Sequence, residues 1–290
     1  MVAIAPPKSS NNNNNLPPTV SDGLPSWVSA NDRKLLQLSA NAIAANVVVA
    51  KDGSGKYKTV KEAVASAPDN TAVGDGFIAQ DVQFQNTAGP QKHQAVALHV
   101  GADQSVINRC KMDAFQDTLY THTLRQFYRD CCCVQLYSKT VNSLPESPMS
   151  GQKNMVTAQG REDPNQVTGT SIQNCDIIPS SDLAPVKGSV KTYLGRPWKA
   201  YSRTVYMQSN IEDHIDPAGW SEWDGDFALK TLYYGEYMNK GAGAGISKRV
   251  NWPGYHKALT ISEATKFTVG QLIQGAAWLK STGVAYTEGL

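Results

Sequence analysis

The feature that most constrains the fold is a series of short apolar segments that recur between Gly76 and Tyr206. Each is about as long as one strand and is bounded by Gly, Asn, Asp or Pro, the residues that interrupt strands. The segments are GFIAQDVQFQNTA, QAVALHV, SVINRCKMDAF, RQFYRDC, TSIQNCDII and RTVYMQSNI. The periodicity of long helices is absent from this region. Short strands without helices between them predict an all-β sandwich, barrel or solenoid.

Two spacings favour the solenoid among these three. Asn stands directly after an apolar strand at four places, and amides at the corners of stacked coils can form ladders. The four residues are Asn86, Asn108, Asn174 and Asn210. Gln94 and Gln116 are 22 residues apart, about one coil, which would stack them on neighbouring strands of one face. We therefore expect a polar groove on the outside of the coils, with Asp117 beside the two glutamines.

The flanks of the strand-rich region differ from it in composition. Residues 1–45 contain five consecutive asparagines and little that could pack, which predicts a disordered tail. The folded domain is predicted to span residues 46–290. It would open with a strand at 46–50 and a helix after Thr59. A second helix is expected after Thr268, with an apolar face made of Leu272, Ile273, Ala276 and Leu279.

Composition excludes several classes of function. The formal net charge is only +2, without the concentrated basic surface of a nucleic-acid binder. No segment approaches the roughly 18 apolar residues of a membrane helix, and no secretory signal is visible at the start. The five cysteines lack C-x-x-C spacing, so neither a metal site nor a cofactor is expected. The serine-esterase motif G-x-S-x-G is also absent.

Five longer motifs together resemble the plant pectin methylesterase family. They are HQAVALHV, AFQDTLYTHTLRQFYRD, SGQKNMVTAQGREDPNQVTGTSIQNC, TYLGRPWKAYSRTVYM and PAGWSEWDGDFALKTLYYGEYMNKGAGA. The resemblance covers about residues 46 to 290 and implies a right-handed parallel β-helix with short flanking helices. It also implies hydrolysis of the methyl esters of homogalacturonan in the plant cell wall. RKLL at 33–36 resembles a processing site, which makes residues 1–45 the remnant of a pro-region linker as well.

The resemblance assigns roles to individual residues. Asp117, in QDTL, matches the acid that protonates departing methanol and then activates water. Gln94 and Gln116 match the side-chain donors that stabilise the oxyanion. Arg196 matches the arginine that keeps a second, nucleophilic aspartate ionised. The expected contacts to pectin come from Tyr120, Trp198, and Trp220 or Trp223.

The chain departs from the family pattern where the nucleophile is expected. The family motif DFIFG is missing, and its place falls on Ser138 or Asn142, neither of which is a carboxylate. Glu146 and Asp130 are the nearest acids, but attack geometry tolerates little displacement. No nucleophile is therefore assigned, and we expect Arg196 to pair with Asp117 instead and hold it ionised.

Two smaller departures accompany the missing nucleophile. The family's G-x-Y-x-E segment is absent between Asn70 and Thr71, and His99 replaces a family arginine. The leading expectation is a pectinesterase of the cell wall whose activity on pectin is impaired. We expect it to be a monomer and to have a proteinaceous pectinesterase inhibitor as a further partner. Two alternatives stay open: a non-catalytic pectin binder, and an incomplete gene product whose missing coils expose the solenoid core.

Overall fold

The computed structural model describes residues 2–5, 74–88, 96–114, 116–131, 153–180 and 183–290. All elements below belong to one compact unit, formed by Met1–Lys8 and Asp75–Leu290. The strand expected at 46–50, the helix expected after Thr59 and residues 6–45 of the predicted tail lie outside the described residues. The proposed domain boundary at residue 46 thus stays a prediction.

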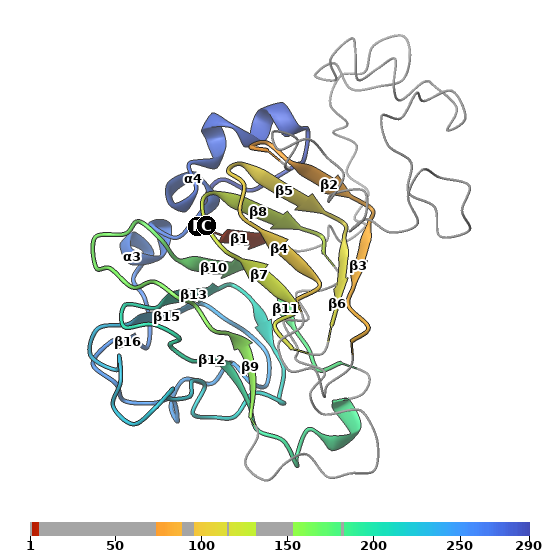
Figure 1. Ribbon diagram of the computed structural model, residues 1–290. Coiled ribbons are helices and arrows are strands. Elements are labelled where there is room, and N and C mark those ends of the chain that lie inside the picture. Colours follow the sequence, from red (N-terminus) through yellow and green to blue (C-terminus); the bar gives the residue numbers. More distant parts are fainter. Residues whose placement is uncertain (1, 6–73, 89–95, 115, 132–152, 181–182) are drawn as a thin grey trace. The chain divides into compact units, whose positions relative to one another are not determined.

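The largest element is an eight-stranded sheet, the main sheet, in the order β16-β15-β13-β10-β1-β8-β5-β2 (Figure 1). Its strands are β1 (Val2–Ala5), β2 (Ile78–Gln80), β5 (Ser105–Asn108), β8 (Gln126–Arg129), β10 (Thr170–Gln173), β13 (Arg203–Met207), β15 (Tyr233–Tyr237) and β16 (Tyr255–His256). Every neighbouring pair is parallel. The strand β1 falls in the stretch that was expected to be disordered, so that expectation is not met at its four residues.

Two further faces complete each coil. On the second face, β3 (Gln83–Gln85) pairs with β6 (Lys111–Asp113), and β11 (Asp176–Ile177) pairs with β14 (Asn210–Ile211). On the third face, β4 (Leu98–Val100) pairs with β7 (Leu119–Thr121), and β9 (Asn154–Thr157) pairs with β12 (Thr192–Gly195). The chain runs repeatedly from the third face to the main sheet and on to the second face. The predicted parallel β-helix is confirmed, and all six apolar segments contain strands.

Each coil turns sharply where it leaves the main sheet. The residue directly after six of the strands has a φ between 48° and 58°, in the left-handed region that L-residues rarely adopt. These residues are Asp81, Arg109, Asp130, Asn174, Gln208 and Met238. Amides beside these corners bond from coil to coil: Asn108 Nδ2 donates to Gln80 Oε1 at 2.8 Å, and Gln173 Nε2 to Gln208 Oε1 at 3.0 Å. The ladder expected from the asparagine spacing is confirmed at Asn108.

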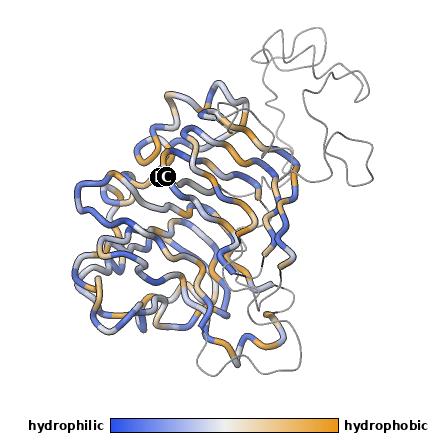
Figure 2. The backbone as a smooth tube through the Cα atoms, in the orientation of Figure 1, coloured by the Kyte–Doolittle hydropathy of each residue, from blue (hydrophilic) through white to orange (hydrophobic). Residues whose placement is uncertain are grey.

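Alternate residues of the main sheet pack on its two sides. Ile107, Tyr128 and Ile172 point into the coils and are fully buried. Val106, Phe127 and Val205 point outward and pack against the C-terminal helices. Adjacent residues such as Val106 and Ile107 are therefore both apolar, and Figure 2 shows hydrophobic colouring on the strands of the main sheet. The main sheet is thus buried on both sides, and the polar side chains of the coils that can meet a ligand lie elsewhere.

The C-terminal helices are shorter than the sequence predicts. They are α3 (Ile261–Thr265) and α4 (Val269–Leu272), followed by the 3-10 turns η4 (Gly275–Ala277) and η5 (Leu279–Thr282); one more, η3 (Ala184–Val186), lies between β11 and β12. The single helix expected to run from Thr268 to Leu279 is wrong because Gln274 adopts a φ of 54°. Leu272, Ile273 and Leu279 are nevertheless buried, as their apolar spacing predicts. No helix in the described part of the chain is long and apolar enough to cross a membrane.

One ion pair between coils makes the fold sensitive to acid. Arg125 donates to both carboxylate oxygens of Asp103, at 3.0 and 2.5 Å, and its backbone N–H donates to the same group at 2.9 Å. These bonds lower the pKa of Asp103 to about 2. Because the folded pKa lies below the unfolded one, the pair stabilises the fold above about pH 4, and this contribution is lost as the pH falls toward 2.

We expect Asp103→Asn to lower the free energy of unfolding by about 2 kcal/mol at pH 7, since each pKa unit corresponds to about 1.4 kcal/mol. Below pH 2 the variant and the parent should be equally stable, because Asp103 is then protonated in both states. Urea titrations at the two pH values measure this difference. A loss of the same size at both would show that the ion pair is not its source.

Candidate active site

The third face brings together most of the residues that the sequence marks for chemistry. Gln116 and Asp117 lie in the turn before β7, and Tyr120 lies in β7 itself. Arg196 and Trp198 follow the end of β12 directly. Gly195, the last residue of β12, forms a parallel bridge with Trp220. Trp223 follows three residues later in the sequence. Gln94 lies outside the described residues, so its predicted role stays a prediction.

Asp117 and Arg196 are close enough for each charge to shift the pKa of the other. Although Asp117 is an exposed residue, loss of water around its carboxyl raises its pKa, and the positive charge of Arg196 opposes that rise. Burial likewise lowers the pKa of Arg196 while the charge of Asp117 raises it. Arg196 thus acts on the Asp117 pKa in the direction that the sequence predicts, and desolvation opposes it with the larger effect. That Arg196 holds Asp117 ionised stays a prediction. A raised pKa makes a carboxyl a better candidate for general acid–base chemistry near neutral pH than a fully solvated one.

The environment of Arg196 is unusual for a half-buried guanidinium. Its Nε is buried and has no hydrogen-bond partner in the described part of the chain. Its guanidinium lies over the ring of Trp223, 4.3 Å from the centroid, in a cation–π contact. Its backbone N–H donates to the carbonyl of Thr157 at 3.1 Å, which fixes the start of the turn. By contrast, Arg125 and Arg249 each donate two bonds to a carboxylate.

Aromatic rings form the surface beside this pair. The rings of Tyr120 and Trp198 meet edge to face with centroids 6.4 Å apart. Trp198 is 41% exposed, and its ring rests on Gly160, where an added Cβ would lie 2.5 Å from a ring carbon. Glycine at 160 is thus required for the tryptophan to sit where it does. Exposed flat rings of this kind suit stacking on sugar rings.

The structure distinguishes between Trp220 and Trp223, which the sequence left as alternatives for a contact to pectin. Trp220 is 1% exposed and stacks on Tyr234 within the core at a centroid distance of 4.1 Å. It therefore has no surface to offer a polysaccharide, and its predicted substrate contact is corrected to a core role. Trp223 is 41% exposed and carries Arg196 on its ring. Of the two, Trp223 is the residue that can contact a ligand.

Two histidines to which the sequence analysis assigned no role in the site, His99 and His122, extend the aromatic cluster. His99 is in register with Tyr120 across the β4–β7 pair, and their rings stack at 4.7 Å. His122 lies 5.2 Å from both rings. The spacing of 21 residues between His99 and Tyr120 could have predicted this contact, but only with the length of a coil already known. No three His, Cys, Asp or Glu side chains gather as a metal site among the described residues.

Of the two acids considered as replacement nucleophiles, Asp130 is the one that the structure describes, and it does not lie beside Arg196. Asp130 lies at the corner after β8 and pairs with Arg129 at 3.3 Å, away from the third face. Ser138, Asn142 and Glu146 lie outside the described residues. Within the described residues, Asp117 is the one carboxylate whose charge acts on Arg196. The arrangement thus offers a proton donor, an amide and a guanidinium.

Comparison with known proteins gives one consistent result. A family model described as Pectinesterase matches residues 70–276. Pectinesterase/pectinesterase inhibitor 18 of Arabidopsis thaliana is 52% identical, and the match covers 93% of this chain and 61% of that protein. Pectinesterase 2.2 of Solanum lycopersicum is also 52% identical, with 92% and 61% covered. The chain thus spans about three-fifths of the length of the curated relatives that it matches.

Solved structures match over the whole of a relative. The chain aligns with pectin methylesterase from carrot at 42% identity and a TM-score of 0.73, covering 87% of this chain and 100% of that one. Pectin methylesterase from Erwinia chrysanthemi shares the fold at 20% identity and a TM-score of 0.55. These matches confirm the right-handed parallel β-helix.

The curated matches also show that residues are missing within the aligned region. The match to the Arabidopsis protein spans 340 residues, whereas 93% of this 290-residue chain is about 270 residues. About 70 positions of the relative therefore have no counterpart here. This difference agrees in kind with the two missing segments that the motifs indicate, before Thr71 and after Asp130.

Proposed function

Because the chain belongs to the pectinesterase family, whose members are carboxylic ester hydrolases, we propose that its third face is a site for methyl-esterified homogalacturonan. The reaction would release methanol and leave a free carboxylate on the sugar. The observation that carries this proposal is the meeting of two distant segments. Asp117 and Tyr120 from one segment meet Arg196 and Trp198 from another, about 80 residues later, in electrostatic and ring contact.

The chemistry follows from the groups present. Asp117, with its raised pKa, donates a proton to the departing methanol oxygen. Gln116 and Gln94 supply amide donors to the oxygen that becomes negative. Tyr120, Trp198 and Trp223 hold the sugar chain by stacking. The described residues supply no carboxylate beside Arg196 other than Asp117 for the attack on the ester carbon, and the family motif for the nucleophile is missing from the sequence. We therefore propose that hydrolysis by this chain is impaired.

Binding to the polymer tests the substrate class separately from catalysis. We expect Trp198→Ala to weaken adsorption to methyl-esterified pectin by about tenfold, since ring stacking on one sugar contributes about 1–1.5 kcal/mol. Phe227→Ala, which removes another exposed ring, is the matched control and should leave adsorption unchanged. If the parent protein does not adsorb to pectin at all, the assignment of the substrate class fails.

A second candidate function, non-catalytic pectin binding, is favoured by the unpartnered Nε of Arg196. No carboxylate of the described residues is hydrogen-bonded to this half-buried guanidinium. It can therefore bind the carboxylate of a de-esterified galacturonate by donating two parallel hydrogen bonds to it. A methyl ester carries no charge and offers a weaker partner. This candidate therefore predicts tighter binding to polygalacturonate than to its methyl ester.

Arg196→Gln should weaken binding to a short oligogalacturonate by about 10- to 100-fold, the range for hydrogen bonds to a charged group. Arg109→Gln removes the same charge at an exposed corner, where Arg109 pairs with Asp81, and should change the affinity little. Isothermal titration calorimetry at moderate salt measures both variants. Equal losses would indicate a general attraction of polyanions, and tighter binding of the methyl ester would exclude carboxylate recognition.

The remaining parts of the proposal concern where the protein acts. Pectin is a component of the plant cell wall, so we propose an extracellular protein of the wall that acts as a monomer. Two relatives carry the words pectinesterase inhibitor in their names. A proteinaceous inhibitor of pectinesterases is accordingly proposed as a further partner. Immunolocalisation of the protein in plant tissue, with the wall and the cytoplasm scored separately, tests the compartment.

A further inference from the structure

The main sheet is continuous only because β1 lies in its middle. Residues 2–5 pair with 126–129 of β8, and residues 2–4 pair with 170–172 of β10, both in parallel. Figure 1 shows the short β1 arrow between these two strands. Neighbouring strands are about 4.8 Å apart, so β8 and β10 stand roughly 10 Å from each other with one strand between them. Removing β1 would leave a slot one strand wide.

Among the described residues, neither of the other two faces has a strand at this level. On the third face β7 pairs with β4 and β9 pairs with β12, and no described strand joins β7 to β9. On the second face β6 pairs with β3 and β11 pairs with β14, and again no described strand joins the two pairs. As far as the structure describes the chain, both faces are thus interrupted between the coils of β8 and β10. Of the described strands, only β1 of the main sheet lies there, and it comes from residues 2–5.

The strand β1 also stands outside the region that matches the family. The family model begins at residue 70, and the relatives' aligned span is about 70 positions longer than this chain's. The motifs indicate a missing segment after Asp130, which follows β8 directly, and the strand that lies beside β8 comes from outside the region matched by the family model. We propose that the slot between β8 and β10 is a strand-binding surface and that residues 2–5 of this same chain are its ligand, replacing the strand of the missing coil.

The sequence of the segment suits such a slot. Ile4 is in register with Tyr128 and Ile172, whose side chains point into the coils, and Ala3 is in register with Phe127 and Ser171. The apolar residue Ile4 thus takes the register position of these two residues in the strand order. The segment contains no proline, so all its N–H groups are available to the two neighbours. Pro6 and Pro7 follow at once and lack the N–H that further pairing requires.

The energetic argument comes from the two strand edges. The facing edges of β8 and β10 would otherwise present unpaired N–H and C=O groups beside a buried core, which is costly and promotes pairing with other chains. An extended apolar segment that bonds to both edges removes this cost. This inference does not depend on what the third face binds, because it concerns the main sheet alone.

Hydrogen exchange on the full chain tests the proposal without any substitution. We expect the amides of residues 3–5 to exchange at least about 100-fold more slowly than in an unstructured peptide, as for sheet amides that need opening of the structure. Exchange at the unstructured rate would overturn the proposal. Protection that depends on protein concentration, together with a dimer in light scattering, would assign the strand to a second copy and overturn the assignment to the same chain.

A paired substitution adds a second readout. Ala3→Pro with Ile4→Pro removes two N–H groups from the strand, and we expect loss of exchange protection at both β8 and β10 and a lower melting temperature. Asn12→Pro adds a proline outside β1 and is the control. The peptide MVAIAPPK, added to the double variant, should restore protection, whereas MVPPAPPK should not. Unchanged protection of β8 and β10 in the double variant would overturn the proposal.

Discussion

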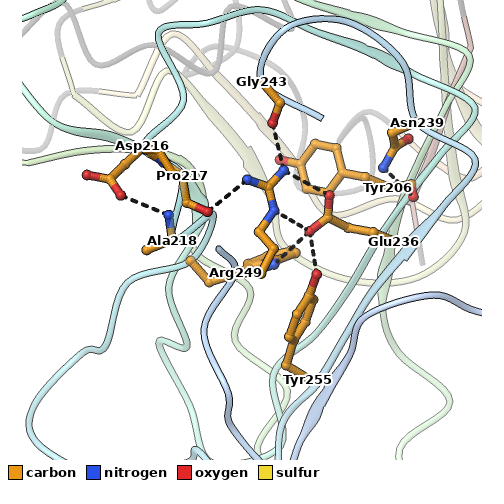
Figure 3. A network of polar contacts seen from close by, with 10 residues as sticks. Tyr206, Asp216, Pro217, Ala218, Glu236, Asn239, Gly243, Arg249 and Tyr255 are labelled. Carbon is orange, nitrogen blue, oxygen red and sulfur yellow. Dashed lines mark hydrogen bonds and ion pairs between the residues drawn. The ribbon is translucent and has the colours of Figure 1, made fainter. Parts of the chain in front are cut away.

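Replacing Arg249 by methionine should lower the free energy of unfolding by about 3–5 kcal/mol, the range for breaking a buried ion pair from one side. Arg249 is fully buried, and Glu236 in β15 is 2% exposed. Arg249 Nε and Nη2 donate to the two oxygens of Glu236, at 2.9 and 3.1 Å (Figure 3). The substitution leaves the Glu236 carboxylate buried without its cation, which costs far more than one hydrogen bond.

The size of the expected effect also reflects the other partners in Figure 3. Arg249 donates to the carbonyls of Gly243 at 2.7 Å and Pro217 at 3.2 Å, which ties two loops to the end of the coils. Glu236 accepts further bonds from the Tyr255 hydroxyl at 2.8 Å and from the Trp220 indole at 3.3 Å. The network joins β15, β16 and the segment that leads to Trp223. Its loss should loosen the third-face aromatic surface as well as the core.

Chemical denaturation measures the effect, with two comparisons. Lys187→Met removes one partner of the exposed pair with Asp213, and should cost no more than about 1 kcal/mol. The double variant Glu236→Met, Arg249→Met should be more stable than Arg249→Met alone, because no uncompensated charge remains. If the double variant is instead the less stable of the two, the cost arises from lost packing and not from the buried charge.

This network was not predictable from the sequence. Glu236 stands in YYGEY, where one acid among aromatic residues gives a weak signal for a buried partner, and Arg249 lies in a loop that gives none. The position of β1 was not predictable either, because its partners lie more than 120 residues away in the sequence. Long-range pairing of this kind leaves no periodic pattern within a window of sequence.

The sequence does predict those features of the fold that repeat along the chain or depend on neighbouring residues. Strand-length apolar runs and corner amides such as Asn108 recur with every coil, so the β-helix follows from them. Asp117 and Arg196 follow from motif resemblance, but their relative charge states do not, because desolvation depends on the packing around both. Trp220 and Trp223 are three residues apart, and only the bridge between Gly195 and Trp220 determines which of them is buried.

The other large effect concerns catalysis: we expect methanol release from methyl-esterified pectin by this chain to fall at least about 10⁴-fold below that of a family member with both aspartates. Loss of a nucleophile in a covalent mechanism costs on the order of 10⁶ in kcat, and the remaining groups retain about 10³- to 10⁴-fold of catalysis over water. Asp117 with its raised pKa and the unpartnered Arg196 would remain, but neither forms the covalent ester.

Asp117→Asn decides between a disabled site and a competent one. In a disabled site the parent and the variant release methanol at the same basal rate, since removing the proton donor matters only once attack on the ester occurs. In a competent site the variant loses the activity of the parent, because amides neither donate a proton to methanol nor activate water. Alcohol-oxidase detection of methanol, run beside the adsorption assay, separates the outcomes. Methanol release that depends on Asp117 and reaches the rate of a family member with both aspartates would overturn the proposal of impaired hydrolysis.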